Sequence, residues 1–292
     1  MCVVACKYLK DIGWVIAKNR DRNYKPIIRI RKSFREGMER LYIWDEKTKY
    51  TEGVNEYGVG IVSASVTVKE DEAEGAVASK KKTKDSDISS KDRVFYSPDG
   101  LRIRTALFEK TAVDAAKRLI ELEIPGNTIV ADKDRCFLLE GAFTSDDEYV
   151  YKIVEVPKEK IAVRTNHGIF LPWTGYSKDI PEQKPSRESS EARYKKAVED
   201  LKKANTFDEV LAALSDTGQE NPQMNPLRLD PTKNSMRTTG QIVVVPNEHT
   251  LHYRAIWCET KFDLDKLNTE TEKTFFEVVS TRKLISFKEF KK

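Results

Sequence analysis

Residues 2–21, CVVACKYLKDIGWVIAKNRD, decide how this chain can fold and what its first residues can do. Two apolar runs, CVVACKYL and WVIAKNRD, flank the turn-forming tripeptide Asp11-Ile12-Gly13. Strand-forming residues on both sides of a glycine-containing turn are typical of a β-hairpin. The first strand of this hairpin begins at Cys2, directly after the initiator methionine. A small second residue normally allows that methionine to be removed, so we expect the mature chain to begin at Cys2.

A cysteine at the N-terminus carries two reactive groups on one residue. In unperturbed form the α-amine titrates at a pKa of roughly 7.7–8.0 and the thiol at about 8.5. An amine with that pKa suits a general base at neutral pH. Thiol and amine together form the N-terminal variant of nucleophilic catalysis. The alternative is that Cys2 is only a small apolar residue near the start of the chain.

The composition is that of an ordinary globular protein. Among the 292 residues, 51 Lys+Arg oppose 47 Asp+Glu, for a formal net charge of +4. This balance excludes a dedicated nucleic-acid binder, whose basic residues would dominate one face. No apolar run approaches the ~20 residues of a membrane-spanning helix, and the first residues lack the pattern of a signal peptide. We therefore expect a soluble, cytoplasmic protein with one domain over residues 2–292.

Strand-like and helix-like segments follow one another in blocks. Strands are predicted within residues 2–21, 26–68, 127–141, 149–166, 240–257 and 273–284, and helices within residues 105–122 and 194–214. Thr111 is expected to start the second of two short helices, and Thr206 with Glu209 forms a capping box before another helix. Residues 69–93 hold blocks of opposite charge and almost no large apolar residue, so we expect a mobile surface loop there. This order favours an α+β domain in which helices cover sheets.

Several segments, in a fixed order after Cys2, resemble one enzyme family. They are KNRD at 18–21, GVNEYGVGIV at 53–62, NTIVADKDRCFLLEG at 127–141, RTNHG at 164–168, a helical stretch at 189–214 and SMRTTGQIVVVPNEHTLHYRA at 235–255. Together they are similar to the cysteine N-terminal nucleophile (Ntn) hydrolases of the choloylglycine hydrolase group. Relatives of that group are penicillin V acylase, the acid ceramidase-like amidases and the acyl-CoA:6-aminopenicillanic acid acyltransferases.

The resemblance implies a fold and a reaction. The fold is a four-layer αββα sandwich, with two antiparallel sheets between helical layers. The reaction is cleavage of a linear amide bond, or acyl transfer, through a thioester on Cys2. The substrate is a small amide or acyl donor, without a cofactor, a metal, a nucleic acid or a membrane as partner. Members of the group often form tetramers, so a homo-oligomer is compatible with the resemblance.

The resemblance also assigns roles to individual residues. Asp21 matches the aspartate that holds the α-amine, and its charge would stabilise the protonated amine. Asn166 matches the asparagine that donates into the oxyanion hole, and the second donor, a backbone N–H, falls at Ser65. Arg237 matches a late arginine near the nucleophile. One position departs from the family, because Lys18 stands where an arginine is usual.

Lys18 and Arg20 are both candidates for the role of that arginine. Positions 18 and 20 of a strand point to the same face, so either side chain could lie beside Cys2. Lysine cannot reproduce the bidentate fork of a guanidinium. The alternatives therefore stay open, and a surface location for Arg20 is a third.

Other residues have weaker claims to a function. Trp173 and His167 are candidates to line the substrate pocket, although a core tryptophan and a hydrogen-bonded loop histidine are the plainer interpretations. His249 and His252 are expected on opposite faces of a strand, which disfavours a shared metal. The remaining cysteines are expected to pack as small hydrophobic residues, and they are Cys6, Cys136 and Cys258.

Two alternative functions and the substrate remain open. A glutamine amidotransferase module also begins at a nucleophilic cysteine, but it would show MCGI and a further synthase domain. A non-catalytic descendant used for binding or assembly is favoured mainly by Lys18. In the family, selectivity lies in variable loops, which correspond here to residues 23–46, 69–93 and 172–188.

Overall fold

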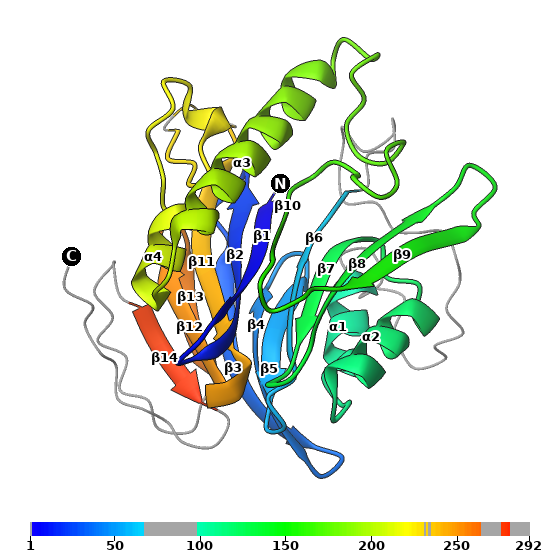
Figure 1. Ribbon diagram of the computed structural model, residues 1–292, viewed down its shortest axis with the longest axis vertical. Coiled ribbons are helices and arrows are strands. Elements are labelled where there is room, and N and C mark those ends of the chain that lie inside the picture. Colours follow the sequence, from blue (N-terminus) through cyan, green and yellow to red (C-terminus); the bar gives the residue numbers. More distant parts are fainter. Residues whose placement is uncertain (1, 67–97, 231, 233–234, 264–275, 281–292) are drawn as a thin grey trace.

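The computed structural model describes residues 2–66, 98–230, 232, 235–263 and 276–280. Two β-sheets are stacked in the centre, and two pairs of helices lie on their outer sides (Figure 1). The loop predicted at residues 69–93 lies outside the described residues.

The predicted N-terminal hairpin is confirmed and belongs to a six-stranded sheet. β1 (Cys2–Leu9) pairs with β2 (Gly13–Arg22), with Cys2 opposite Arg20 and Leu9 opposite Gly13. Gly13 has a φ of +92°, a backbone conformation that few other residues adopt at a turn. The strand order is β10-β1-β2-β11-β12-β14. The other strands are β10 (Ile161–Arg164), β11 (Arg237–Val245), β12 (Thr250–Ala255) and β14 (Phe276–Ser280).

The second sheet has eight strands in the order β13-β3-β4-β5-β6-β7-β8-β9. Their bounds are β3 (Ile27–Arg35), β4 (Met38–Asp45), β5 (Thr51–Asn55), β6 (Gly60–Ala64), β7 (Gly126–Ala131), β8 (Cys136–Phe143), β9 (Tyr149–Glu155) and β13 (Glu259–Asp263). Every pairing between the described strands is antiparallel except β13 with β3, which is parallel. Residues 23–46, expected to include a selectivity loop, are therefore mostly a β-hairpin.

The described helices are α1 (Pro98–Ala106), α2 (Ala112–Glu121), α3 (Lys184–Lys203) and α4 (Phe207–Leu214). Thr111 caps α2 by accepting a hydrogen bond from the backbone of Asp114, and Thr206 and Glu209 form the predicted capping box of α4. The prediction was wrong for α1 and α3, because both begin before the residues assigned to them. Their N-terminal turns lack the apolar periodicity on which the prediction depended.

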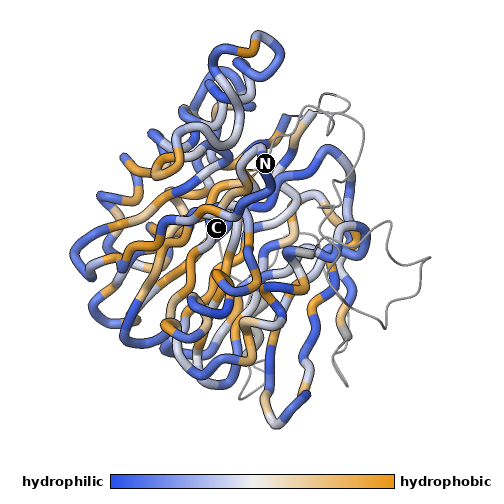
Figure 2. Tube along the Cα trace, turned by 90° about the vertical axis from the view of Figure 1, so that its right-hand side faces the viewer, coloured by the Kyte–Doolittle hydropathy of each residue, from blue (hydrophilic) through white to orange (hydrophobic). Residues whose placement is uncertain are grey.

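Three apolar clusters separate four layers, so the αββα arrangement is confirmed. One cluster fills the space between the sheets, one joins the six-stranded sheet to α3 and α4, and one joins the eight-stranded sheet to α1 and α2. Figure 2 shows the apolar stretches running along the strands and the hydrophilic ones at the loops. Apolar burial of this kind supplies the main driving force for folding.

The alternation of side chains along β1 decides where Cys2 points. Cys2, Val4 and Cys6 belong to the cluster between the sheets, whereas Val3 and Ala5 pack toward α3 and α4. Cys2 therefore stands at the edge of the inter-sheet core.

The other cysteines pack as predicted. Cys6 and Cys136 are buried between the sheets, and Cys258 is half-buried against the same cluster.

Candidate active site

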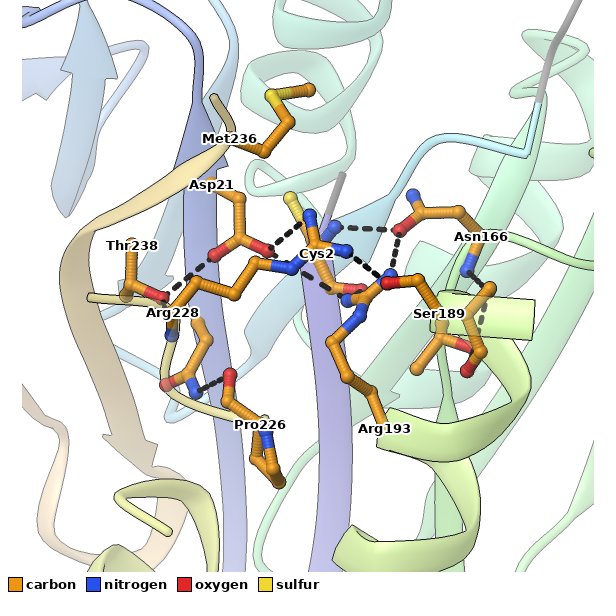
Figure 3. A network of polar contacts seen from close by, with 12 residues as sticks. Cys2, Asp21, Asn166, Ser189, Arg193, Pro226, Arg228, Met236 and Thr238 are labelled. Atoms are coloured by element: carbon orange, nitrogen blue, oxygen red, sulfur yellow. Dashed lines mark hydrogen bonds and ion pairs between the residues drawn. The ribbon is translucent and has the colours of Figure 1, made fainter. Parts of the chain in front are cut away.

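Cys2 lies at the start of β1, where the six-stranded sheet meets α3 (Figures 1 and 3). Its side chain is only 4% exposed. The backbone N–H donates to Oδ1 of Asn166 at 2.7 Å, and the carbonyl accepts from Nη1 of Arg193 at 3.0 Å. The first residue of the strand is thus held at its nitrogen and at its oxygen.

Asn166 follows β10 and has a fixed amide orientation. Its Oδ1 accepts from Cys2 and, at 3.2 Å, from Nη2 of Arg193, while its Nδ2 donates to the carbonyl of Ser65 at 2.6 Å. Because two donors face Oδ1 and a carbonyl faces Nδ2, only one assignment of the amide satisfies all three contacts. The backbone N–H of Asn166 donates to Ser190 Oγ of α3. The two residues predicted for the oxyanion hole, Asn166 and Ser65, are therefore in contact.

Asp21 lies on β2, fully buried, beside Cys2 (Figure 3). Its Oδ1 accepts from the hydroxyl of Thr238 at 2.9 Å. Its Oδ2 lies 3.7 Å from Nη1 of Arg193 and 3.6 Å from Nη1 of Arg228. The nitrogen of Cys2 is held by Asn166, so the predicted contact of Asp21 with the α-amine stays a prediction.

The guanidinium groups that contact Cys2 and Asp21 belong to residues that the sequence did not single out. The predicted arginine, Arg237, lies with its guanidinium 4.5 Å from the ring of Trp257 and donates to the carbonyl of Thr232. Arg193 comes from α3, and Arg228 comes from the segment before β11. Burial lowers the pKa of both, and for Arg193 the neighbouring charge of Arg228 adds to that effect.

A weak signal for Arg193 is present in the sequence. It stands four residues before Ala197 and eight before Leu201, on the helix face that is buried. Ser189 and Ser190 continue that face toward the N-terminus of α3. An arginine on a predicted buried face needs a partner, and a carboxylate such as Asp21 is the expected one.

Behind Cys2, on the same face of the hairpin, two cations share one carboxylate. Lys18 and Arg20 are both buried, and both donate to the carboxylate of Glu52 on β5. Lys18 also donates to the carbonyl of Ser63 at 2.6 Å. Arg20 lies 3.9 Å from Asp45. Both positions thus face the core, and the surface location considered for Arg20 is wrong.

The thiol of Cys2 has a lowered pKa. Burial raises this pKa, but nearby positive charges outweigh it, with Lys18 first, the N-terminal amine second and Arg22 third. The negative charge of Asp21 opposes them weakly. Since the thiolate is the nucleophilic form of cysteine, this environment favours reactivity at Cys2.

His167 and Trp173, predicted for the substrate pocket, differ in their surroundings. His167 is buried, and its Nδ1 hydrogen-bonds the hydroxyls of Thr165 and Ser190 at 3.0 and 2.8 Å. Burial lowers its pKa to about 4, so the ring is neutral near pH 7. Trp173 is 56% exposed, which leaves its ring accessible to a ligand.

Glu140 anchors the loop between these two residues. It lies inside β8, whose pairing with β9 continues to Phe143. Its buried carboxylate accepts the backbone N–H groups of Ile169, Phe170 and Leu171 at 2.9–3.2 Å. Three N–H donors on one carboxylate fix the start of the segment that carries Trp173.

The described residues show neither a metal site nor a membrane span. No group of three or more His, Cys, Asp or Glu in this part of the chain could hold a metal ion. Burial lowers the pKa of His252 to about 4, and its Nε2 lies 3.1 Å from the hydroxyl of Thr250. No helix within the described ranges is long and apolar enough to cross a membrane.

Comparison with known proteins identifies the fold. A scan against models of known protein families gives no match, and a search of curated proteins gives none. Among solved structures, a variant of conjugated bile acid hydrolase from Clostridium perfringens matches with 12% identity over 87% of this chain and 89% of its own, at a TM-score of 0.51.

Two further structures match over greater lengths but with lower scores. Penicillin V acylase from Agrobacterium tumefaciens has 12% identity over 100% of this chain and 98% of its own, at a TM-score of 0.45. A second variant of the Clostridium perfringens hydrolase has 11% identity over 99% and 97%, at 0.44. The match to the first structure, together with the four confirmed layers, shows that this chain has the αββα fold of conjugated bile acid hydrolase.

Proposed function

We propose that this protein hydrolyses linear, non-peptide amide bonds with Cys2 as its nucleophile. The observation that carries the proposal is the environment of that thiol. A buried cysteine with a lowered pKa begins β1, and its nitrogen is bound by the side chain of Asn166. The fold is that of an enzyme named for hydrolysing conjugated bile acid.

The proposed reaction begins with removal of Met1, which leaves a free α-amine on Cys2. The Cys2 thiol gives its proton to that amine, and the thiolate attacks the carbonyl carbon of the amide. The oxyanion forms near Asn166 and Ser65. There, Nδ2 of Asn166 gives up its hydrogen bond to the Ser65 carbonyl and donates to the oxyanion. Hydrogen-bond donors at that position stabilise a tetrahedral intermediate by about 3–4 kcal/mol.

Breakdown of the intermediate completes acylation. The C–N bond breaks, the α-ammonium of Cys2 gives its proton to the leaving amine, and a thioester remains on the sulfur. A water molecule then attacks the thioester carbonyl and loses a proton to the α-amine. The C–S bond breaks, the acid is released, and the α-ammonium returns its proton to the Cys2 thiolate. If an amine or a thiol attacks in place of water, the same intermediate gives acyl transfer.

Asp21, Arg193 and Arg228 would hold the amine end of the site. Both arginines lie within 3.7 Å of the Asp21 carboxylate, and Arg193 also binds the carbonyl of Cys2. These contacts restrict the position of the nucleophile before the substrate binds, which lowers the entropic cost of attack. The proposed role of Lys18, Arg20 and Glu52 is to set the charge around the Cys2 thiol.

The exposed ring of Trp173 is proposed to contact the acyl group. The described cysteines are all free, which fits a reducing compartment such as the cytoplasm.

Intact mass and covalent trapping test the proposal. Met1 should be absent from the purified protein, because a retained Met1 would block the amine. A thiol-reactive acyl probe should add one acyl group to the wild type and none to Cys2→Ala. Cys258→Ala is the matched control, since Cys258 is the half-buried thiol that could react by chance. Labelling that survives in Cys2→Ala would refute Cys2 as the nucleophile.

A further inference from the structure

Glu52 occupies an unusual place for a carboxylate. It lies on β5, on the face of the eight-stranded sheet that packs on the six-stranded sheet, and its side chain is completely buried. One of its oxygens accepts from Lys18 and the other from Arg20. A buried carboxylate is costly unless it is paired and hydrogen-bonded. Here one carboxylate from one sheet binds two cations from the other.

The two cations depend on Glu52 to different degrees. Arg20 has a second carboxylate, Asp45, within 3.9 Å, and its guanidinium stays protonated in proteins. Lys18 has Glu52 as its one carboxylate contact among the described residues. Burial, together with the charges of Arg20 and Arg22, lowers the pKa of Lys18. The charge of ionised Cys2, first, and that of Glu52, second, oppose the shift in the Lys18 pKa. Removing the charge of Glu52 would therefore act mainly on the protonation of Lys18.

Lys18 in turn acts on Cys2. Arg20 lies opposite Cys2 in the β1–β2 pairing, and Lys18 lies opposite Val4. Because side chains alternate along a strand, Lys18 and Arg20 point to the inter-sheet face on which Cys2 and Val4 lie. Lys18 is the leading positive side chain in the environment of the Cys2 thiol. A lysine that loses its proton can no longer favour the thiolate by charge.

We infer that Glu52 is a positioning residue for the nucleophile: it keeps Lys18 protonated beside Cys2, and the protonated Lys18 keeps the thiol ionisable near neutral pH. The inference rests on the proposed function only in taking Cys2 as the nucleophile. It also explains how a lysine can stand where the resembling family has an arginine. An arginine keeps its charge in any surroundings, whereas a buried lysine needs a fixed carboxylate to keep its proton.

Several other groups face Lys18 and Cys2 and contribute to the same titration. They are the N-terminal amine, Tyr50, whose ring lies 4.4 Å from the ammonium of Lys18, Arg20, Asp21 and Arg22 on β2, Arg193 on α3, Arg228 before β11 and, beside Arg20, Asp45 at the end of β4. All of them are kept in the variants below, so the Glu52 and Lys18 variants change only the Lys18–Glu52 pair.

The test measures the pH dependence of Cys2 alkylation by iodoacetamide, with the modified residue located by mass spectrometry. Glu52→Gln should raise the apparent pKa of the thiol by about one unit, and Lys18→Met should raise it by a similar amount. The double variant should raise it no further than Lys18→Met alone, because Glu52 acts through Lys18. Glu56→Gln, the same chemical change four residues along at a half-buried position, should leave the profile unchanged.

A purely structural role for Glu52 predicts a different result. Glu52→Gln would then lower thermal stability but leave the alkylation profile at its wild-type position, which would overturn the inference. A lowered thiol pKa in Glu52→Gln would overturn it too, since it would mean that Lys18 stays charged without Glu52. If Glu52→Gln does not fold, Lys18→Met decides alone, and an unchanged profile in that variant refutes the inference.

The same measurement separates this inference from the proposed function. Alkylation needs no substrate and no amide hydrolysis. If the wild type hydrolyses no amide but the Glu52→Gln substitution raises the pKa of the Cys2 thiol, the proposed function is refuted and the role of Glu52 is supported.

Discussion

Replacing Asn166 with alanine tests the centre of the proposed site. The substitution removes the acceptor for the Cys2 nitrogen at 2.7 Å and for Arg193 at 3.2 Å, and the donor to the Ser65 carbonyl at 2.6 Å. The side chain is only 4% exposed, so little water can replace these contacts. Both the rate of acylation and the stability of the protein should therefore fall.

The magnitudes follow from the partners of Asn166. A lost oxyanion donor lowers an acylation rate by roughly 10²–10³. For stability, the hydrogen bond to Ser65 is worth about 1 kcal/mol, and each buried donor left without its acceptor costs about 1–3 kcal/mol. Arg193 keeps its contacts with Cys2 and Asp21, so the loss of its hydrogen bond to Asn166 adds little to the total cost in stability. We expect a loss of about 2–4 kcal/mol in the free energy of unfolding.

The assay separates the two effects. Single-turnover acylation by the acyl probe, followed by intact mass, gives the rate, and denaturant unfolding gives the stability. Asn55→Ala is the matched control, because Asn55 is also buried and its amide makes four backbone hydrogen bonds, at the turn between β5 and β6. It should lose stability but keep its acylation rate. A rate change below tenfold in Asn166→Ala would contradict the oxyanion role.

Three further variants test other parts of the structure. Arg193→Met should lower the acylation rate at least tenfold, because it removes the hydrogen bond to the Cys2 carbonyl. Arg237→Met should change the rate less than threefold, because Arg237 lies against Trp257. A larger effect of Arg237→Met than of Arg193→Met would restore the role predicted for Arg237. The pKa of His252 is lower in the folded chain than in the unfolded one, so its stabilisation is present above about pH 6.5 and is lost as the pH falls toward 4. Denaturant unfolding at pH 7 and pH 5 should show a loss of stability that is about 2 kcal/mol smaller in His252→Gln than in the wild type, since His167, whose pKa is also lowered to about 4, contributes to the loss in both proteins. An equal loss in the two proteins would exclude a contribution from His252. Thr206→Ala should cost about 1 kcal/mol by removing the capping box of α4, and an unchanged thermal midpoint would contradict the cap.

Much of the fold was predictable because local rules and tertiary structure agree. The hairpin over residues 2–21, the caps at Thr111 and Thr206 and the apolar face of α3 all follow from patterns within one element. The parallel pairing of β13 with β3 was not predictable in this way. It joins residues 259–263 to residues 27–31, and no local pattern specifies a partner so far along the chain.

The candidate site divides in the same manner. Cys2, Asp21 and Asn166 could be named from short motifs and their order. Glu52 could not, because nothing in its own segment marks it, and Arg193 shows only a weak signal, its place on the buried face of a helix. Their importance comes from partners more than 30 residues away, Cys2 for Arg193 and Lys18 for Glu52.

The sequence by itself determined that Cys2 starts a hairpin and that Lys18 and Arg20 point to the same face of their strand, because strand periodicity is a local property. Only the tertiary structure decided which charges surround the thiol. That choice depends on stacking β5 against β2 and α3 against β1, which brings Glu52 to Lys18 and Arg193 to Cys2. Electrostatic effects on a pKa act through distance in space, and sequence separation gives no measure of it.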